Sequence, residues 1–225
     1  MKNILIIAAH PDDEMLGCGG TIVKKIKEGF TAYSLILGEG ITGRDNKREP
    51  ERRKSELRNL KDQSLKANKA LGIHSVQFMD LPDNRFDSIP LLDIVKSIEK
   101  SIRRIKPEII YTHFRNDLNI DHQIAYKCVI TATRPSITNY IKEIYSFEIS
   151  SSTENNFPLS FSPNTFSDIS KYLPKKIKAL SYYKNEMKPY PHPRSLKSVT
   201  LTAKGWGIKY GLNYAEAFEV VRLIG

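Results

Sequence analysis

The amino-acid sequence predicts an α/β protein built on a mostly parallel sheet with helices on both faces. Strand-like and helix-like patterns alternate through the first two thirds of the 225 residues, an order typical of parallel strands joined by helical crossovers. The run from Ile4 to Ala9 is continuously apolar, as expected for a strand covered on both faces. The chain length and its 40% of hydrophobic residues suffice for one large domain with a sizeable core.

The expected strands are short apolar runs bounded by polar or turn-forming residues. They cover residues 4–9, 31–37, 76–79, 108–113 and 141–149. The segments between them carry apolar residues at helical spacing. These helices comprise residues 14–28, a charged helix that carries Leu57, Leu60, Leu65 and Leu71 and stops at Gly72, residues 90–105, and residues 121–133. Gly29 and Pro135 follow two of the helices, as expected of residues that end them.

The alternation breaks after residue 149. Residues 150–165 are polar without periodicity, which predicts a long loop, and residues 170–187 have a helical pattern. A further helix starts at Leu196, and residues 217–223 form either a strand or a helix. We therefore expect a single domain, residues 1–225, in which a core of residues 1–149 is joined by a C-terminal α/β extension, residues 150–225, that completes the site.

Composition and charge narrow the class of protein. No apolar run approaches the roughly 18 residues of a membrane span, and the apolar N-terminal run is too short for a signal peptide, so we expect a cytoplasmic protein. Cys18 and Cys128 are too few for a disulfide framework. The net charge of +10 is spread over helix faces, which indicates solvated surfaces or a bias toward anionic substrates. Aromatic residues do not alternate with the basic ones, so we expect no nucleic-acid partner.

Two polar motifs follow predicted strands, at the end of a sheet where ligands bind in this class of fold. The first is His10-Pro11-Asp12-Asp13-Glu14. The second, THFRNDLNIDHQ, contains His113, Asp117, Asp121 and His122. Together, His10, Asp13 and His122 would form a two-histidine, one-carboxylate site that suits Zn²⁺ and also Fe²⁺. Asp12 would then be placed to take a proton from metal-bound water.

Plainer interpretations of these residues stay open. Aspartates in a turn before a helix are often N-caps, because their carboxylates accept hydrogen bonds from free backbone N–H groups. The glycines of LGCGGT, residues 16–21, suggest a phosphate-binding loop, but they do not match G-x-G-x-x-G and lie inside the predicted helix. Close packing of that helix on the sheet explains these glycines better.

The motifs together resemble the PIG-L/LmbE-like family of metal-dependent N-deacetylases, and its bacterial LmbE-like branch in particular. AAHPDDEMLGCGGTI and DLNIDH carry the resemblance, supported by EMKPYPHPRSL and AEAFEVVR near the C-terminus. The resemblance implies a Rossmann-like fold and a zinc-dependent hydrolase that removes an N-acetyl group from an N-acetylglucosamine-type sugar. By position it implies His10, Asp13 and His122 as metal ligands and Asp12 as the general base. Fe²⁺ or another divalent metal is the alternative to Zn²⁺.

One position departs from the family pattern. Family members often have H-P-D-H at the second motif, whereas this chain has Asn119-Ile120-Asp121-His122. Asn119 can donate a hydrogen bond to a developing oxyanion but supplies no positive charge. We expect His192, between two prolines, to take that role, although His192 could also be a plain surface histidine. His113, at a strand end, is a further option for the role. Asp121 is either the outer hydrogen-bond partner of a ligand histidine or the N-cap of the next helix.

Five charged residues in predicted loops are candidates for substrate binding. They are Arg44, Asp83, Arg85, Asp87 and Arg194. Because arginine suits bidentate phosphate contacts, we expect a small N-acetylated sugar, with or without a phosphate group. Related proteins often form homo-oligomers, so we also expect a homo-oligomer, with aromatic residues of the C-terminal third, such as Trp206, at its interface. The alternatives are a metal hydrolase for another N-acyl or carbamoyl-like substrate, and a basic, non-catalytic binding protein with a degenerate site.

Overall fold

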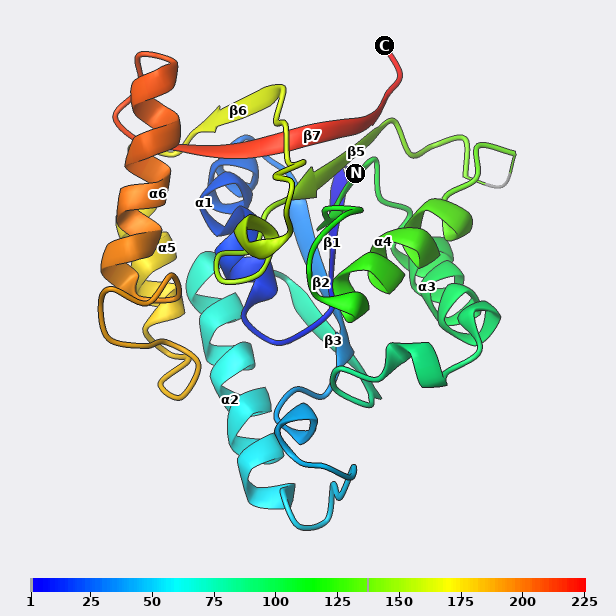
Figure 1. Ribbon diagram of the computed structural model, residues 1–225. Coiled ribbons are helices and arrows are strands. Elements are labelled where there is room, and N and C mark those ends of the chain that lie inside the picture. Colours follow the sequence, from blue (N-terminus) through cyan, green and yellow to red (C-terminus); the bar gives the residue numbers. More distant parts are fainter. Residues whose placement is uncertain (1, 137) are drawn as a thin grey trace.

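The computed structural model describes residues 2–136 and 138–225, and a seven-stranded sheet organises them (Figure 1). The strands are β1 (Asn3–Ala8), β2 (Thr31–Gly38), β3 (Ser75–Leu81), β4 (Ile109–His113), β5 (Glu143–Phe147), β6 (Thr165–Asp168) and β7 (Ala215–Leu223). Their order is β3-β2-β1-β4-β5-β7-β6. The first five are parallel, whereas β7 runs antiparallel to β5 and to β6. The prediction of a mostly parallel α/β sheet is confirmed.

Helices cover both faces of this sheet. They are α1 (Asp13–Lys27), α2 (Lys54–Leu71), α3 (Leu91–Ile105), α4 (Ile120–Ala132), α5 (Leu173–Leu180) and α6 (Leu196–Lys209), with short 3-10 turns η1 (Thr42–Arg44), η2 (Phe86–Ser88) and η3 (Thr153–Asn155). Successive side chains of a strand point to opposite faces, so Ile4 and Ile6 pack with α1, α2 and α5. Leu5 and Ile7 pack with α3 and α4 on the other side (Figure 1). The central strands are therefore buried on both faces.

The expected elements of the first 149 residues all form, with ends within two residues of the prediction. The C-terminal third differs more. The helix expected over residues 170–187 is shorter, because α5 stops at Leu180 and Tyr183 turns into the core to donate its hydroxyl to Glu14. Strand β6 was not predicted, since four residues carry too little periodicity. Residues 217–223, for which strand and helix were both open, belong to strand β7.

A buried ion pair joins the C-terminal third to α1. The Glu216 carboxylate accepts hydrogen bonds from the backbone N–H groups of Gly20 and Thr21 and from the Thr21 hydroxyl. The Lys176 ammonium lies 2.6 Å from Glu216 Oε1 and also donates to the carbonyl of Leu16. Because its charges are paired and hydrogen-bonded, this contact fixes β7 and α5 against the helix that begins at the acidic motif.

No helix among the described residues is both long enough and apolar enough to cross a membrane.

Candidate active site

The neighbouring strands β1 and β4 bring the two polar motifs together at their carboxyl ends. His10 follows β1, and Asp13 begins α1 directly afterwards. His122 lies in the first turn of α4, after β4. Since the carboxyl ends of parallel strands meet at one edge of the sheet, residues 112 positions apart come into contact there.

Three buried donor atoms face one another at this edge. His122 Nε2 lies 3.3 Å from His10 Nδ1 and 3.4 Å from Asp13 Oδ2, and His10 Nδ1 lies 3.4 Å from the same oxygen. Ligand atoms about 2.0–2.1 Å from a tetrahedral zinc ion lie roughly 3.3–3.4 Å from one another. The spacing of His10, Asp13 and His122 therefore fits a single tetrahedral cation.

The outer nitrogen of each of these histidines faces a carboxylate. His10 Nε2 lies 3.0 Å from Asp121 Oδ2 and 3.2 Å from Asp83 Oδ1. His122 Nδ1 lies 3.1 Å from Asp117 Oδ1. His10, Asp83 and Asp121 are also spaced like a cation site. However, a ring whose inner nitrogen binds a metal normally keeps a proton on the outer one, so we interpret these carboxylates as partners that orient the two rings.

Two of these three carboxylates, Asp121 and Asp117, are themselves anchored by hydrogen bonds. Asp121 accepts the backbone N–H groups of Asn84 and Phe86. Asp117 accepts the hydroxyl hydrogens of Ser152 and Thr153, which follow β5. Each histidine is thus held by a carboxylate that neighbouring segments of the chain keep in place.

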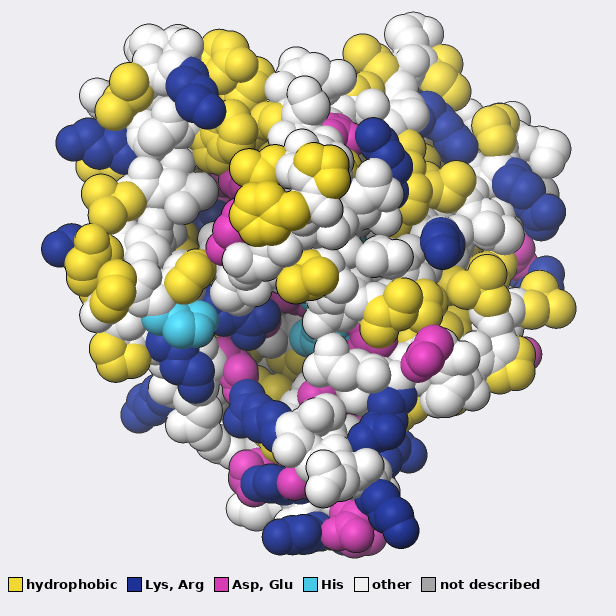
Figure 2. Space-filling view, viewed as in Figure 1, with side chains coloured by type: hydrophobic (Ala, Val, Ile, Leu, Met, Phe, Trp, Pro, Cys, Tyr) yellow, Lys and Arg dark blue, Asp and Glu magenta, His cyan; other side chains and the backbone are white. Residues whose placement is uncertain are grey.

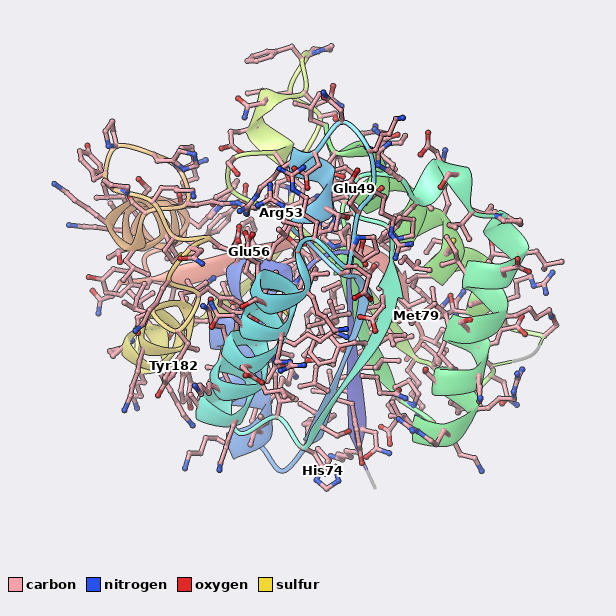
Figure 3. The ribbon with its side chains drawn as sticks, turned by 90° about the horizontal axis from the view of Figure 1, so that it is seen from below. Glu49, Arg53, Glu56, His74, Met79 and Tyr182 are labelled. Atoms are coloured by element: carbon pink, nitrogen blue, oxygen red, sulfur yellow. The ribbon has the colours of Figure 1, made fainter. Side chains whose placement is uncertain are left out.

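The other histidines occupy different environments. His113, at the end of β4, stacks on His122 with ring centroids 4.0 Å apart, and its Nε2 accepts the Ala9 N–H at 2.8 Å. Burial, together with the charge of His122, lowers the pKa of His113 well below its usual value, so its neutral ring can accept this bond. His74 is exposed, at the end of the molecule opposite Arg53 (Figure 3).

Pairing between histidines and aspartates offsets the free-energy cost of burying their charges in this site. Burial favours the neutral form of Asp13, but the charge of His122 and hydrogen bonds with His10 and His122 hold the pKa of Asp13 well below its usual range. Burial also disfavours the charged form of His10, whereas hydrogen bonds to Asp121 and Asp13 raise its pKa well above the usual value. A cation between the three donors would satisfy the same charges and release protons on binding.

Asp12 is held in an unusual conformation beside these donors. Its φ of 105° lies in the left-handed region, which costs free energy for a non-glycine residue and is often found at functional sites. Its backbone N–H donates to Glu14 Oε2 at 3.0 Å, and Glu14 in turn accepts from Asn68 and Tyr183. Burial raises the pKa of Glu14 to about 7. Glu14 therefore fixes the backbone at Asp12.

The two carboxylate oxygens of Asp12 have different surroundings. Oδ2 lies 3.1 Å from Nη1 of Arg194, whereas Oδ1 is buried without a hydrogen-bond partner among the described residues. Burial raises the pKa of Asp12 well above its usual value, and the charge of Arg194 opposes that rise. Asp12 thus combines a basic carboxylate with one free oxygen.

A cavity of about 220 Å³ opens beside His10 and Asp12. Figure 2 shows the hollow below the centre of the view, surrounded by acidic and basic side chains. Among the residues predicted to bind substrate, Arg44, Asp83 and Arg194 line it. Arg85, which donates to the carbonyls of Asp45 and Asn46, and the exposed Asp87 lie outside this lining.

The two residues expected to stabilise an oxyanion lie in different places. Asn119 lines the cavity, donates from Nδ2 to Asn84 and caps α4 by accepting the N–H of Asp121. His192 is exposed and outside the cavity lining, and its Nδ1 accepts the backbone N–H of Arg194. The guanidinium of Arg194 is the positive charge that touches Asp12.

Sequence reasoning did not assign roles to two residues of this site. Asp117 belongs to the quoted second motif, but its partners Ser152 and Thr153 are more than thirty positions away, so its role had no local signal. Glu186 lies in an irregular stretch after α5, and both of its carboxylate oxygens accept from Nη2 of Arg44, each at 2.8 Å. Only the folded chain brings these pairs together.

The PIG-L family model, described as GlcNAc-PI de-N-acetylase, matches residues 5–133, more than half of the chain. The chain belongs to the PIG-L family. The uncharacterized deacetylase YaiS of Escherichia coli strain K12 is 30% identical to it over 190 residues, which cover 82% of this chain and 91% of that protein. The diacetylchitobiose deacetylase of Thermococcus kodakarensis is 25% identical over 236 residues, 98% of this chain and 84% of that protein. The family resemblance and the expected enzyme class, an N-deacetylase, are confirmed.

The fold is also found in an enzyme with a different reaction. GalB, the 4-carboxy-2-hydroxymuconate hydratase of Pseudomonas putida KT2440, matches with a TM-score of 0.77 and 21% identity, over 100% of this PIG-L family chain and 98% of that chain. At this identity the likeness concerns the fold alone. The reaction must therefore be argued from the site residues.

Proposed function

We propose that this PIG-L family protein is a zinc-dependent hydrolase that removes the N-acetyl group from an N-acetylglucosamine-type sugar or sugar conjugate. The observation that carries the proposal is the tetrahedral spacing of His10, Asp13 and His122 beside the partly unpaired carboxylate of Asp12. The family description and the two named deacetylases support the reaction, and the Thermococcus relative supports the substrate class.

Hydrolysis of an amide at neutral pH needs an activated water and a protonated leaving amine. A zinc ion held by His10, Asp13 and His122 would acidify water and polarise the amide carbonyl. Asp12 accepts the proton of the attacking water at its free oxygen and returns it to the nitrogen as the C–N bond breaks. The backbone hydrogen bond to Glu14 keeps Asp12 in position during both transfers.

Arg194 supplies the positive charge that Asn119 lacks. Its guanidinium lines the cavity and contacts Asp12, so it favours the ionised base and a negatively charged carbonyl oxygen nearby. Asn119 adds a polar amide to the same cavity. His192 acts indirectly in this scheme, because it accepts the backbone N–H of Arg194.

Arg44, Arg194 and Glu186 would select the substrate at the cavity mouth. Glu186 pairs with Arg44 at 2.8 Å and lies 3.9 Å from Arg194. The carboxylate thus occupies the position at which an anionic substituent of the substrate, such as a phosphate, would bind the two guanidinium groups. Neutral sugars instead offer hydroxyl groups to the same side chains.

The proposal is tested by measuring both products of the reaction. Purified protein supplied with Zn²⁺ is incubated with N-acetylglucosamine, its 6-phosphate and N,N'-diacetylchitobiose, and acetate and free amine are quantified in parallel. We expect equal amounts of acetate and amine from at least one sugar. Absence of acetate from every N-acetyl sugar contradicts the proposal, and addition of water to an unsaturated acid would favour the hydratase chemistry of the structural neighbour.

A further inference from the structure

A separate cavity, of about 170 Å³, opens between the second half of α1 and the side of the sheet formed by β4, β5, β6 and β7. Helix α1 runs from the acidic motif toward β6 and β7 (Figure 1). Lys24, in the lining, lies roughly 16 Å from Asp13 along the helix axis, at about 1.5 Å per residue. Among the described residues, none lines both this cavity and the one beside His10 and Asp12. No step of the proposed reaction uses this part of the molecule.

Aromatic rings form one wall of this α1 cavity. Tyr111 and Tyr145 stack with their ring centroids 5.3 Å apart and an angle of 23° between the ring planes. Phe218 makes an edge contact with Tyr111, also at 5.3 Å. All three residues line the cavity. Such a wall favours an aromatic ring over an aliphatic group of similar size, because stacked and edge-to-face contacts add to the free energy of burial.

Hydroxyl groups of the α1 cavity are free to bind a ligand. Tyr111 is only 2% exposed, yet its hydroxyl makes no hydrogen bond with another described residue. Burial raises the pKa of Tyr111 well above its usual value, so this hydroxyl remains a donor. On β6, Thr165 pairs with Phe218, and Thr165 and Ser167 both line the cavity. A buried donor without a partner costs free energy, which an acceptor oxygen of a ligand would recover.

Lys24 brings a positive charge to the same cavity. The neighbouring Lys25 pairs with Glu28 at 3.3 Å, whereas no carboxylate of the described residues lies within 4 Å of the Lys24 ammonium. Asp168, on the adjacent strand β6, already accepts hydrogen bonds from the N–H and hydroxyl of Ser170. The charge of Lys24 is therefore available to an anionic ligand.

We propose that the α1 cavity is a second binding site, which takes a small aromatic ring that carries an anionic group, such as benzoate. An engineered cavity of about 150 Å³ holds benzene, so a cavity of about 170 Å³ suits one ring rather than a nucleotide. The ring lies against Tyr111 and Tyr145, and the anionic group lies between the Lys24 ammonium and the Tyr111 hydroxyl. The site does not depend on the proposed function, since it uses none of the residues of that reaction.

The first experiment separates the two features of the ligand. Isothermal titration calorimetry of the zinc-loaded protein compares benzoate with benzyl alcohol, which lacks the charge, and with cyclohexanecarboxylate, which lacks the planar ring. We expect benzoate to bind at least about tenfold more tightly than benzyl alcohol, because its hydrogen bonds are charge-assisted. We expect a difference of about threefold from cyclohexanecarboxylate. Equal affinities for benzoate and benzyl alcohol, or no binding of benzoate, would overturn the site.

The second experiment locates the ligand with side-chain variants. Tyr111→Phe removes only a hydroxyl without a partner, so the Tm should not fall, but we expect benzoate affinity to fall at least about fivefold. Lys24→Gln should lower the affinity about threefold, as expected of a half-exposed charge. Lys27→Gln, at an exposed position of α1 outside the lining, is the matched control and should bind normally. Unchanged affinity in both cavity variants would overturn the site.

A carboxylate can also bind zinc or the arginines of the proposed active site. The benzoate titration is therefore repeated with metal-free protein and with Arg194→Gln. We expect the affinity to change by less than about twofold, because distant sites behave independently. Loss of binding in either sample would place benzoate in the active site and overturn the α1 site. Acetate release is measured separately, so a failure of the hydrolase proposal and a failure of this site are distinguished.

Discussion

The two halves of the candidate site are built differently. The predicted metal ligands and Asp12 come from the ends of central strands, lie within the region matched by the family model, and are buried. Glu186 and Arg194 come from the turns between α5 and α6. Strand ends hold atoms to the precision that metal binding needs, whereas turns tolerate changes in sequence. Under the proposed function, the first half performs the reaction with help from the charge of Arg194, and the rest of the second half selects the substrate.

Loss of a proposed metal ligand from the first half of the site should have the largest effect on metal binding and activity. Asp13→Ala removes one of three protein donors, and protein sites bind Zn²⁺ with roughly 10–16 kcal/mol in total. We expect zinc affinity to fall at least about a thousandfold and acetate release to fall to background. Metal content by mass spectrometry and the acetate assay measure these effects. Asp62→Ala, on the exposed face of α2, is the control, and full zinc occupancy in Asp13→Ala would disprove the ligand assignment.

Asp12→Asn should separate catalysis from metal binding within the same half. Asparagine tolerates a positive φ, so the turn should fold, but the amide cannot accept the proton. We expect kcat to fall about a hundred- to ten-thousandfold with unchanged zinc content. An active variant would place the general base elsewhere.

Asp117→Asn tests whether the carboxylate behind His122 orients it. Loss of an outer partner typically weakens metal binding about 10- to 100-fold, and we expect a decrease of that size in a chelator-competition titration. Ser152→Ala, which removes only one of the hydroxyl groups that anchor Asp117, should give a smaller decrease. Unchanged affinity in both variants would restrict Asp117 to a structural role.

Glu186→Gln tests the second half and should have the smallest effect. Removing this charge frees Arg44 and Arg194 for an anionic group, so we expect the preference for N-acetylglucosamine 6-phosphate over the neutral sugar to rise about fivefold, close to 1 kcal/mol. Zinc content should not change. The matched control is Glu49→Gln, which removes an acidic charge in the loop before α2 (Figure 3). An equal change in the control would indicate a general effect of charge.

The sequence predicted more of the first half of the site than of the second half. His10, Asp13 and His122 stand out because each motif is short and follows an apolar strand, and parallel strands bring such ends together. Asp117 was visible in its motif, but its partners Ser152 and Thr153 are distant in sequence. Arg194 was expected only to bind substrate, because nothing near it in the sequence indicates a contact with Asp12.

The sequence by itself determined the alternating strands and helices, the burial of the central strands and the chemical types of the predicted metal ligands. These properties follow from local periodicity and from motifs a few residues long. Tertiary structure alone decided that the side chain of Arg194 contacts Asp12, across 182 positions of the chain. It also decided how Glu216 and Lys176 hold the C-terminal third against α1. Such contacts depend on the packing of whole elements, whose arrangement leaves no periodic signal in either of the segments that meet.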